Sequence, residues 1–184
     1  GNVTVTIAAD PATPDQCTFA PATLTFTTAN WNVAQTMTTT AVNDAVVEGT
    51  HSCTTGVISA AGGGYAGVTG TAPTFTITDN DTGTIVVTNT VPTATEGGAN
   101  GAFTVVLGLQ PSGTVTVTIA ADPATPDQCT FAPTTLTFTT ANWNTAQTVT
   151  TTAVNDLIVE GSHSCTTGTI SASGGSYAGV TGTA

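Results

Sequence analysis

Short stretches in which apolar and polar residues alternate run along the whole chain. VTVTIAA at residues 3–9 and PTFTIT at 73–78 are examples, and no stretch shows the 3.6-residue period of a helix. A period of two places successive side chains on opposite faces of a strand, so the pattern predicts half-buried β-strands. Turn-forming residues such as Gly, Pro and Asn separate the stretches. The sequence therefore predicts an all-β fold.

The chain repeats itself at a distance of 112 residues. Residues 3–72 and 115–184 align without a gap, and only nine of these seventy positions differ, for example Met37 against Val149. A period of this length indicates whole domains in tandem rather than a solenoid. Two periods exceed the 184 residues by 40, so we expect a window cut from a longer array.

Each repeat is expected to hold seven short strands, A to G, in tandem antiparallel β-sandwiches of immunoglobulin-like type. They are predicted near 84–88, 102–108, 115–120, 135–140, 146–154, 164–172 and, for strand G, 73–78; the first copies of C to F fall at 3–8, 23–28, 34–42 and 52–60. We expect unit 1 at residues 1–82, without its first two strands, and unit 2 at 83–184, without its last. A neighbouring chain or further sequence is expected to pair the open strand edges.

Charge is distributed in an unusual way. The chain has eleven acids, two His and neither Lys nor Arg, which gives a net charge of −11. A nucleic-acid partner and attraction to an anionic membrane surface are both excluded, because both need cationic side chains. No apolar run approaches the length of a membrane span, so direct membrane insertion is not expected.

Four cysteines form two pairs with the same spacing. Cys17 and Cys53 are 36 residues apart, as are Cys129 and Cys165, and no CxxC occurs. We expect one disulfide in each repeat and therefore an oxidising, secreted or cell-surface location. Buried free thiols are the alternative.

The acids fall in one set of loops. If strands alternate in direction, the A–B, C–D and E–F loops and the end of strand G share one pole of the sandwich. All eleven acids lie there: Asp10, Asp15, Asp44, Glu48, Asp79, Asp81, Glu96, Asp122, Asp127, Asp156 and Glu160. Clustered carboxylates repel each other by about 4 kcal/mol per close pair at an effective dielectric constant of 20. Since no Lys or Arg compensates, a hard cation such as Ca²⁺ is the predicted cofactor; the alternative is that the acids decorate solvated loops.

These motifs, in this order, resemble a Calx-β domain. TATEGGANGAFTVVL supplies a Glu in the A–B loop, TPDQCTF an Asp after strand C, AVNDAVVEG and AVNDLIVEG an acidic E–F loop, and ITDND a triplet that ends strand G. The resemblance implies a seven-stranded sandwich with calcium bound at one tip. The ligands that it implies are Asp15, Asp44, Glu48, Asp79, Asn80, Asp81, Glu96, Asp127, Asp156 and Glu160.

Some residues depart from that family pattern. Asn43 and Asn155 stand where the family usually has an acid. Asp10 and Asp122 have no counterpart, and each precedes Pro, so a turn-forming role competes with ligation. Because Asp79 to Asp81 end one domain and Thr84 begins the next, the proposed ion would stiffen the joint between domains.

Catalysis is not expected. His51 with Ser52, and His163 with Ser164, could suggest a base and a nucleophile, but neighbouring residues on a strand point to opposite faces. We therefore interpret the protein as a non-enzymatic structural extender of a fibre or adhesin, of bacterial type, whose partners are neighbouring repeats or identical chains. A filament built by strand complementation is the first alternative. A carbohydrate- or surface-binding module is the second, and it would need exposed aromatic side chains in a groove.

Overall fold

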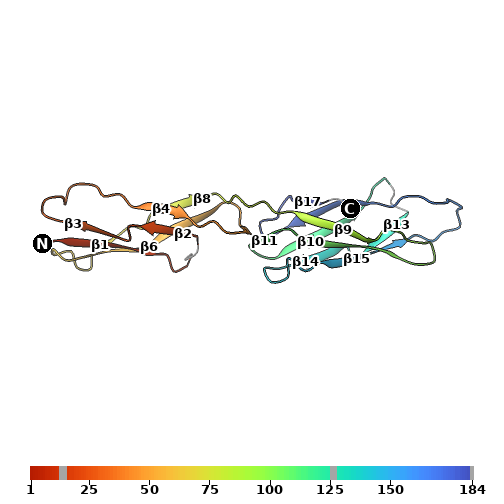
Figure 1. Cartoon of the computed structure of the whole chain (residues 1–184), viewed down its shortest axis with the longest axis horizontal. Helices are drawn as coiled ribbons and strands as arrows, with labels where there is room; N and C mark the ends of the chain where they lie inside the picture. The colour runs from red at the N-terminus through yellow and green to blue at the C-terminus, as the bar shows by residue number, and fades with distance from the viewer. Residues whose placement is uncertain (13–15, 125–127, 183–184) are drawn as a thin grey trace. The chain divides into compact units, whose positions relative to one another are not determined.

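The computed structural model describes residues 1–12, 16–124 and 128–182, and in these residues the fold is all-β (Figure 1). The chain forms two compact units. Unit 1 comprises Gly1–Asp44 and Thr50–Asp79, and unit 2 comprises Ala45–Gly49 and Asn80–Ala184. The described part of the chain contains no helix of the length and apolar character that a membrane crossing requires. The predicted fold class is confirmed at the level of antiparallel β-sheets.

Unit 2 is a β-sandwich of two four-stranded antiparallel sheets. The first sheet has the order β14 (Thr135–Phe138), β12 (Val115–Ala121), β16 (Thr167–Ser173), β17 (Thr181–Gly182). The second has the order β13 (Cys129–Ala132), β15 (Gln147–Ala153), β10 (Gly101–Leu107), β9 (Ile85–Val91). The buried positions of β10 and β12 alternate along each strand, as the sequence pattern predicts.

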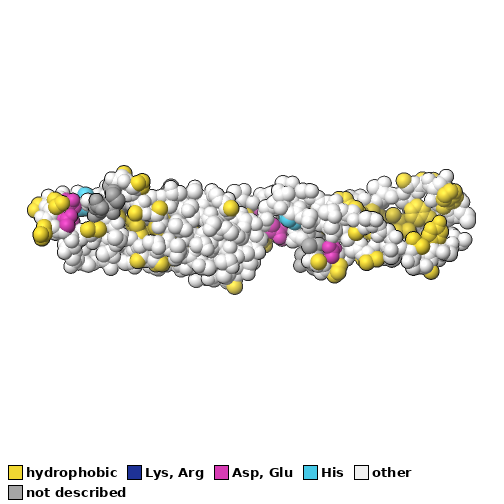
Figure 2. All heavy atoms as spheres, turned by 180° about the vertical axis from the view of Figure 1, so that it is seen from behind, with side chains coloured by type: hydrophobic (Ala, Val, Ile, Leu, Met, Phe, Trp, Pro, Cys, Tyr) yellow, Lys and Arg dark blue, Asp and Glu magenta, His cyan; other side chains and the backbone are white. Residues whose placement is uncertain are grey.

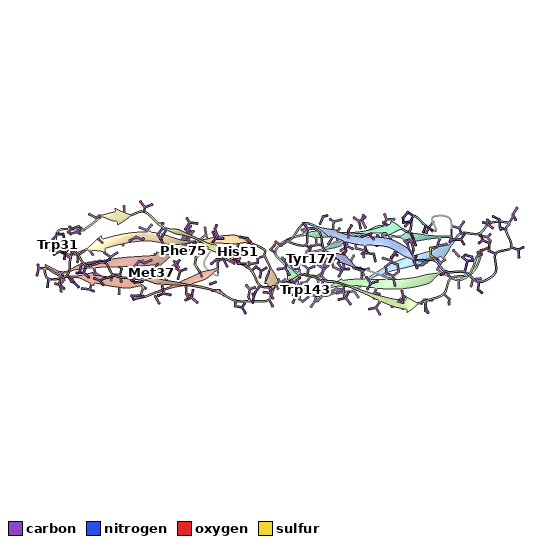
Figure 3. The ribbon with its side chains drawn as sticks, turned by 90° about the horizontal axis from the view of Figure 1, so that it is seen from above. Trp31, Met37, His51, Phe75, Trp143 and Tyr177 are labelled. Atoms are coloured by element: carbon purple, nitrogen blue, oxygen red, sulfur yellow. A yellow bond between two sulfur atoms is a disulfide. The ribbon has the colours of Figure 1, made fainter. Side chains whose placement is uncertain are left out.

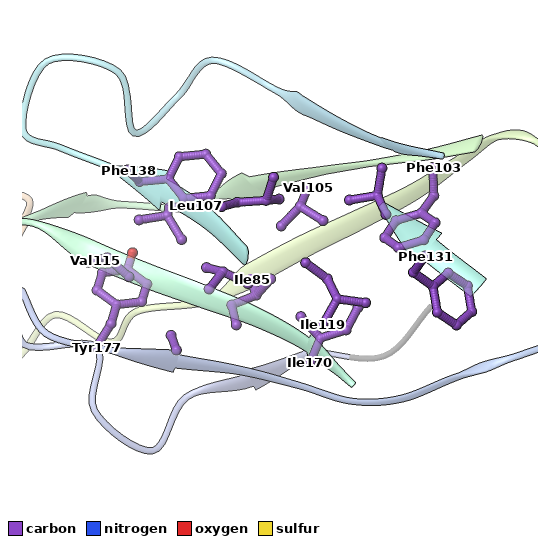
Figure 4. Close-up of a cluster of buried hydrophobic side chains, with 14 of the residues drawn as sticks. Ile85, Phe103, Val105, Leu107, Val115, Ile119, Phe131, Phe138, Ile170 and Tyr177 are labelled. Atoms are coloured by element: carbon purple, nitrogen blue, oxygen red, sulfur yellow. The ribbon is translucent and has the colours of Figure 1, made fainter. Parts of the chain in front are cut away.

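The core of unit 2 lies between these two sheets (Figure 4). Strands β9 and β10 contribute Ile85, Phe103, Val105 and Leu107, and the rings of Phe103 and Phe131 meet edge to face at 6.1 Å. The opposite sheet contributes the fully buried side chains Val115, Val117, Phe138 and Ile170. This burial of apolar surface is the main source of stability for the unit.

A short parallel strand pair completes unit 2. In this unit β5 (Val46–Val47) pairs with β11 (Gln110–Pro111), and Val47 is part of the buried core. The Ser176 hydroxyl donates a hydrogen bond to the Glu48 carbonyl oxygen at 2.8 Å. Ser176 stands where the first repeat has Gly64, so one of the nine sequence differences carries this contact.

Unit 1 has the same kind of first sheet but a reduced second one. The first sheet has the order β3 (Thr23–Phe26), β1 (Val3–Ala9), β6 (His51–Ala61), β7 (Thr69–Gly70), and β8 (Thr74–Ile77) also pairs with β6. The second contains β2 (Cys17–Ala20) and β4 (Thr38–Ala41). Its core among the described residues is small: Cys17, Cys53 and Ile77, with Phe19 and Phe75 packed against them.

Several short strands were not expected from the sequence. β2 and β13 lie in the stretch that we assigned to the C–D loop, and β5, β7, β11 and β17 span two residues each. Tertiary pairing explains them, because Cys17–Ala20 lies antiparallel to Thr38–Ala41, and a four-residue segment carries too little periodicity to be recognised alone.

Both predicted disulfides are present. Cys17 is bonded to Cys53 and Cys129 to Cys165, with Cα–Cα distances of 6.2 and 6.1 Å, and the described residues include no free cysteine. The first disulfide joins β2, which begins at Cys17, to β6, which contains Cys53. The second joins β13, which begins at Cys129, to Cys165 in the segment just before β16.

The Tyr177 side chain provides a test of the core of unit 2. It is fully buried; its hydroxyl donates to the Leu109 carbonyl at 2.7 Å and accepts from the Leu109 N–H at 3.2 Å. Replacing Tyr177 with Phe should destabilise unit 2 by about 1–3 kcal/mol, since both backbone groups lose a partner. Urea unfolding followed by Trp143 fluorescence in a Trp31→Phe background measures this. Tyr65→Phe, the equivalent change in unit 1, is the control; followed by Trp31 fluorescence in a Trp143→Phe background, it should have little effect.

Alkaline pH should act through the same hydroxyl. Burial raises the pKa of Tyr177, outweighing the hydrogen bonds to the backbone of Leu109 and Thr84. The folded unit then holds this proton more tightly than the unfolded chain, so its contribution to stability is complete below the unfolded pKa of about 10 and is lost as pH rises through the folded pKa. Urea midpoints from pH 8 upward should fall more steeply for the parent than for Tyr177→Phe; parallel curves would contradict this.

Candidate metal centre

One end of unit 2 is hollowed. The hollow has a volume of about 840 Å³. Its walls come from the β9–β10 loop, from Phe103 and Phe131 of the core, and from the segment 158–167 with the disulfide half Cys165. It therefore combines an apolar floor with polar loops at its rim.

Three possible metal ligands meet at this rim. Glu96 comes from the β9–β10 loop, and Glu160 and His163 come from the segment between β15 and β16; one ligand atom from each lies within 4.8 Å of the others. Nε2 of His163 is 3.7 Å from Oε2 of Glu160, and Gln128 donates to Oε1 of Glu160 at 3.4 Å. In residues 1–12, 16–124 and 128–182 no second such group occurs.

The local electrostatics favour a cation. The two carboxylates come from loops separated by more than sixty residues, and the chain has no Lys or Arg to set between them. The imidazole of His163 is the one nearby side chain of the group that can carry a positive charge, and its Nδ1 lies 3.0 Å from the Gly161 carbonyl oxygen. With Nδ1–H donating to that oxygen, Nε2 is left on the side of Glu160, 3.7 Å from its Oε2.

The neighbouring polar residues of unit 2 supply further oxygens. A Cβ built on Gly97 would lie 3.6 Å from the amide oxygen and nitrogen of Asn155, so the loop after Glu96 passes beside that residue. Asp156 uses Oδ1 to accept a hydrogen bond from the Ile158 N–H at 2.7 Å. The A–B and E–F loops of the second repeat therefore meet, while Asp127 lies outside the described residues.

The other predicted ligands are distributed over both units. Asp44 and Asp79 belong to unit 1, whereas Glu48, Asn80 and Asp81 belong to unit 2. Asp15 lies outside the described residues. The assignment of these residues as ligands stays a prediction.

Asp10 and Asp122 have matching turn contacts in the two repeats. Oδ1 of each accepts the backbone N–H two residues later, from Ala12 or Ala124, at 2.9 Å. The other oxygen accepts a threonine hydroxyl, from Thr54 or Thr166. These bonds, first that from Ala124 and then that from Thr166, lower the pKa of Asp122. The contacts support the turn-forming interpretation of both residues.

His163 is the member of the cluster that the sequence did not indicate. If this segment were a strand, alternation would point the His163 side chain away from those of its neighbours. In the structure, residues 154–166 contain no strand, so Glu160 and His163 lie on the same side, three residues apart. The spacing Glu-x-x-His was the available signal.

Comparison with known proteins adds no family. No protein-family model and no curated protein sequence matches this chain. The resemblance to Calx-β domains therefore stays a prediction from the motifs.

Proposed function

We propose that this chain is a structural extender module of a repetitive secreted or cell-surface fibre, with Calx-β-like domains of immunoglobulin-like type that calcium stiffens. The observation that carries the proposal is the convergence of Glu96 and Glu160 from two loops in a chain without Lys or Arg. The near-identity of the repeats and the disulfide in each also support it. No described feature favours an enzyme.

The donor set at the rim fits a hard cation in part. Glu96 and Glu160 offer carboxylate oxygens; the Asn155 amide lies next to Gly97, and the Gly161 carbonyl oxygen lies 3.0 Å from Nδ1 of His163. Ca²⁺ takes six to eight oxygens, so the two carboxylates would need further oxygens from backbone carbonyls, amide side chains or water. The imidazole nitrogen of His163 suits Zn²⁺ or Mn²⁺ better than Ca²⁺. When bound, the ion would offset carboxylate repulsion and tie the two loops together.

Calcium should stabilise unit 2. A ligand that binds only the folded state adds about 2.7 kcal/mol at one hundred times its dissociation constant. We expect the melting temperature of the full chain, stripped with EDTA, to rise with CaCl₂, and Glu96→Gln or Glu160→Gln to abolish the rise. Small-angle scattering with and without calcium then tests whether the particle lengthens.

Three comparisons sharpen the test. Glu48→Gln changes the first-repeat equivalent of Glu160, and it should leave the response of unit 2 in place. A response to Zn²⁺ but not to Ca²⁺, lost in His163→Asn, would replace calcium with a transition metal. If no metal changes the melting temperature, the stiffening role fails.

One observation favours a second candidate, a carbohydrate-binding module. The structure exposes Trp31 and Tyr65 on the same groove of unit 1, and exposed aromatic side chains are what a sugar stacks on. A glycan array probed with the parent and with Trp31→Ala distinguishes the two functions, because only sugar binding would depend on this residue.

A further inference from the structure

Several equivalent residues of the two repeats are buried in unit 2 but exposed or only half-buried in unit 1. Tyr177 is 0% exposed, whereas its equivalent Tyr65 is 53% exposed; Trp143 is half-buried against the core, whereas Trp31 is 71% exposed (Figure 3). Four further pairs are fully buried in unit 2 and only half-buried in unit 1: Val115 and Val3, Val117 and Val5, Phe138 and Phe26, and Ile170 and Ile58. Local sequence cannot cause this, because these residues are identical in the two repeats.

The strands β9 and β10 account for the difference. In unit 2 their side chains Ile85, Phe103, Val105 and Leu107 belong to the same buried cluster as the core residues of β12 and β16. The ring of Tyr177 lies against Gly83, where a Cβ would meet it at 2.7 Å, and its hydroxyl bonds to Leu109. Among the described residues of unit 1, no strand occupies the equivalent place.

The strand on which β10 pairs in unit 2 is shorter in unit 1. In unit 2 β10 pairs with Gln147–Thr151, the first five residues of β15. In unit 1 β4 begins at Thr38, and residues 35–37, the equivalents of Gln147–Val149, are not in a strand. The hydrogen-bonding edge that β10 uses is therefore not formed as strand in the first repeat.

The open face is an apolar groove of about 320 Å³, which Figure 2 shows as a hollow among hydrophobic side chains at the right of the view. It is lined by Val3, Val5, Phe26, Trp31, Ile58, Ser59, Ala60, Tyr65, Val68, Thr69 and Gly70. The lining contains no charged side chain, so shape and apolar contact must select whatever binds here.

We propose that this groove binds a β-hairpin with the sequence of β9 and β10, supplied by a second copy of the repeat sequence. The hairpin adds a strand to the edge of β4 and places its apolar side chains on Val5, Phe26 and Ile58, a mode of recognition known as β-augmentation. The inference rests on the burial of the two repeats and holds whether or not calcium binds.

The second repeat indicates which segment would fill the groove of unit 1. Residues 83–112 already cover an identical set of side chains in unit 2, and the one charged residue in that segment, Glu96, lies in the loop between its strands. Neither a sugar nor a flat apolar surface matches both the groove and the strand edge, because neither offers backbone donors and acceptors at strand spacing.

A peptide of residues 83–112 tests the proposal on the full chain. The peptide has no Trp or Tyr. In the Trp143→Phe variant, Trp31 is the only fluorophore of its kind, and binding should shift its emission to shorter wavelength with saturation at one peptide per chain. Hydrogen exchange should slow at the amides of residues 35–39, where the β4 edge lengthens.

Matched variants define the mode of binding. Tyr65→Ala should weaken binding by more than about tenfold, since the equivalent ring is fully covered in unit 2. A peptide with Phe103→Asp and Val105→Asp should not bind. Three results would overturn the proposal: no saturable shift, equal affinity for the substituted peptide, or glycan binding that Trp31→Ala removes.

Discussion

Replacing Phe138 with Ala should cost unit 2 about 3–5 kcal/mol, the usual range for deleting a buried phenylalanine ring. Phe138 is fully buried between the two sheets of unit 2, where Leu107, Val105 and Val115 are also buried (Figure 4). A domain of this size is stable by only 5–15 kcal/mol, so the loss is a large fraction of the total. Urea unfolding followed by Trp143 fluorescence in the Trp31→Phe background measures it.

Phe26 is the matched control, because it occupies the same position in the first repeat but is only half-buried. Phe26→Ala removes the same atoms from a site that already faces solvent on one side, so the loss in unit 1, followed by Trp31 in a Trp143→Phe background, should be clearly smaller. Equal losses would show that the groove of unit 1 is covered in solution, which is the result expected if another copy already occupies it.

The pattern of apolar and polar residues predicted the longer strands of the sheets but not the short strands β2, β7, β13 and β17. A strand near 84–88 was expected and β9 spans Ile85–Val91; one near 115–120 was expected and β12 spans Val115–Ala121. The prediction of β12 rests on the period of two in VTVTIA, whereas that of β9 rests on the run of β-branched residues TIVVT. The equal spacing of the cysteines likewise predicted one disulfide in each repeat, and the structure confirms both.

What the sequence could not supply are properties that arise from distant parts of the chain. Tyr65 and Tyr177 sit in the same local sequence, GGGYAG and GGSYAG, yet one is exposed and the other buried. The difference is decided by residues 83–109, which pack on Tyr177 from far along the chain. His163 was missed for a related reason, because its direction depends on whether residues 154–166 form a strand.

The two repeats show complementary openings. Unit 1 has a strand, β8, over its disulfide, with Phe75 opposite Cys53, but has no strand equivalent to β9 or β10 among its described residues. Unit 2 has β9 and β10 but carries the hollow of about 840 Å³ beside its own disulfide. Each repeat thus shows which kind of segment packs on the corresponding face of the other.

The same contrast predicts that the two disulfides differ in reactivity. Cys53 is fully buried and Cys17 nearly so, whereas Cys165 is partly exposed and lines the hollow of unit 2. Reduction requires a thiolate to reach a sulfur atom, so access sets the relative rate when the loops are alike. In native buffer with dithiothreitol, Cys129–Cys165 should be reduced first, as measured by alkylation and peptide mass spectrometry over time.

Losing that bond should cost unit 2 about 4 kcal/mol, because opening a loop closed at a separation of 36 residues returns this much chain entropy to the unfolded state. The Cys129→Ala, Cys165→Ala double variant measures the loss by urea unfolding, with Cys17→Ala, Cys53→Ala as its partner of equal loop length. In denaturant both bonds should be reduced at one rate, since folding then shields neither. If the two bonds are reduced at equal rates in native buffer, or if Cys17–Cys53 is reduced first, the hollow of unit 2 is closed in solution. A strand equivalent to β8 of unit 1 would then be the segment that closes it.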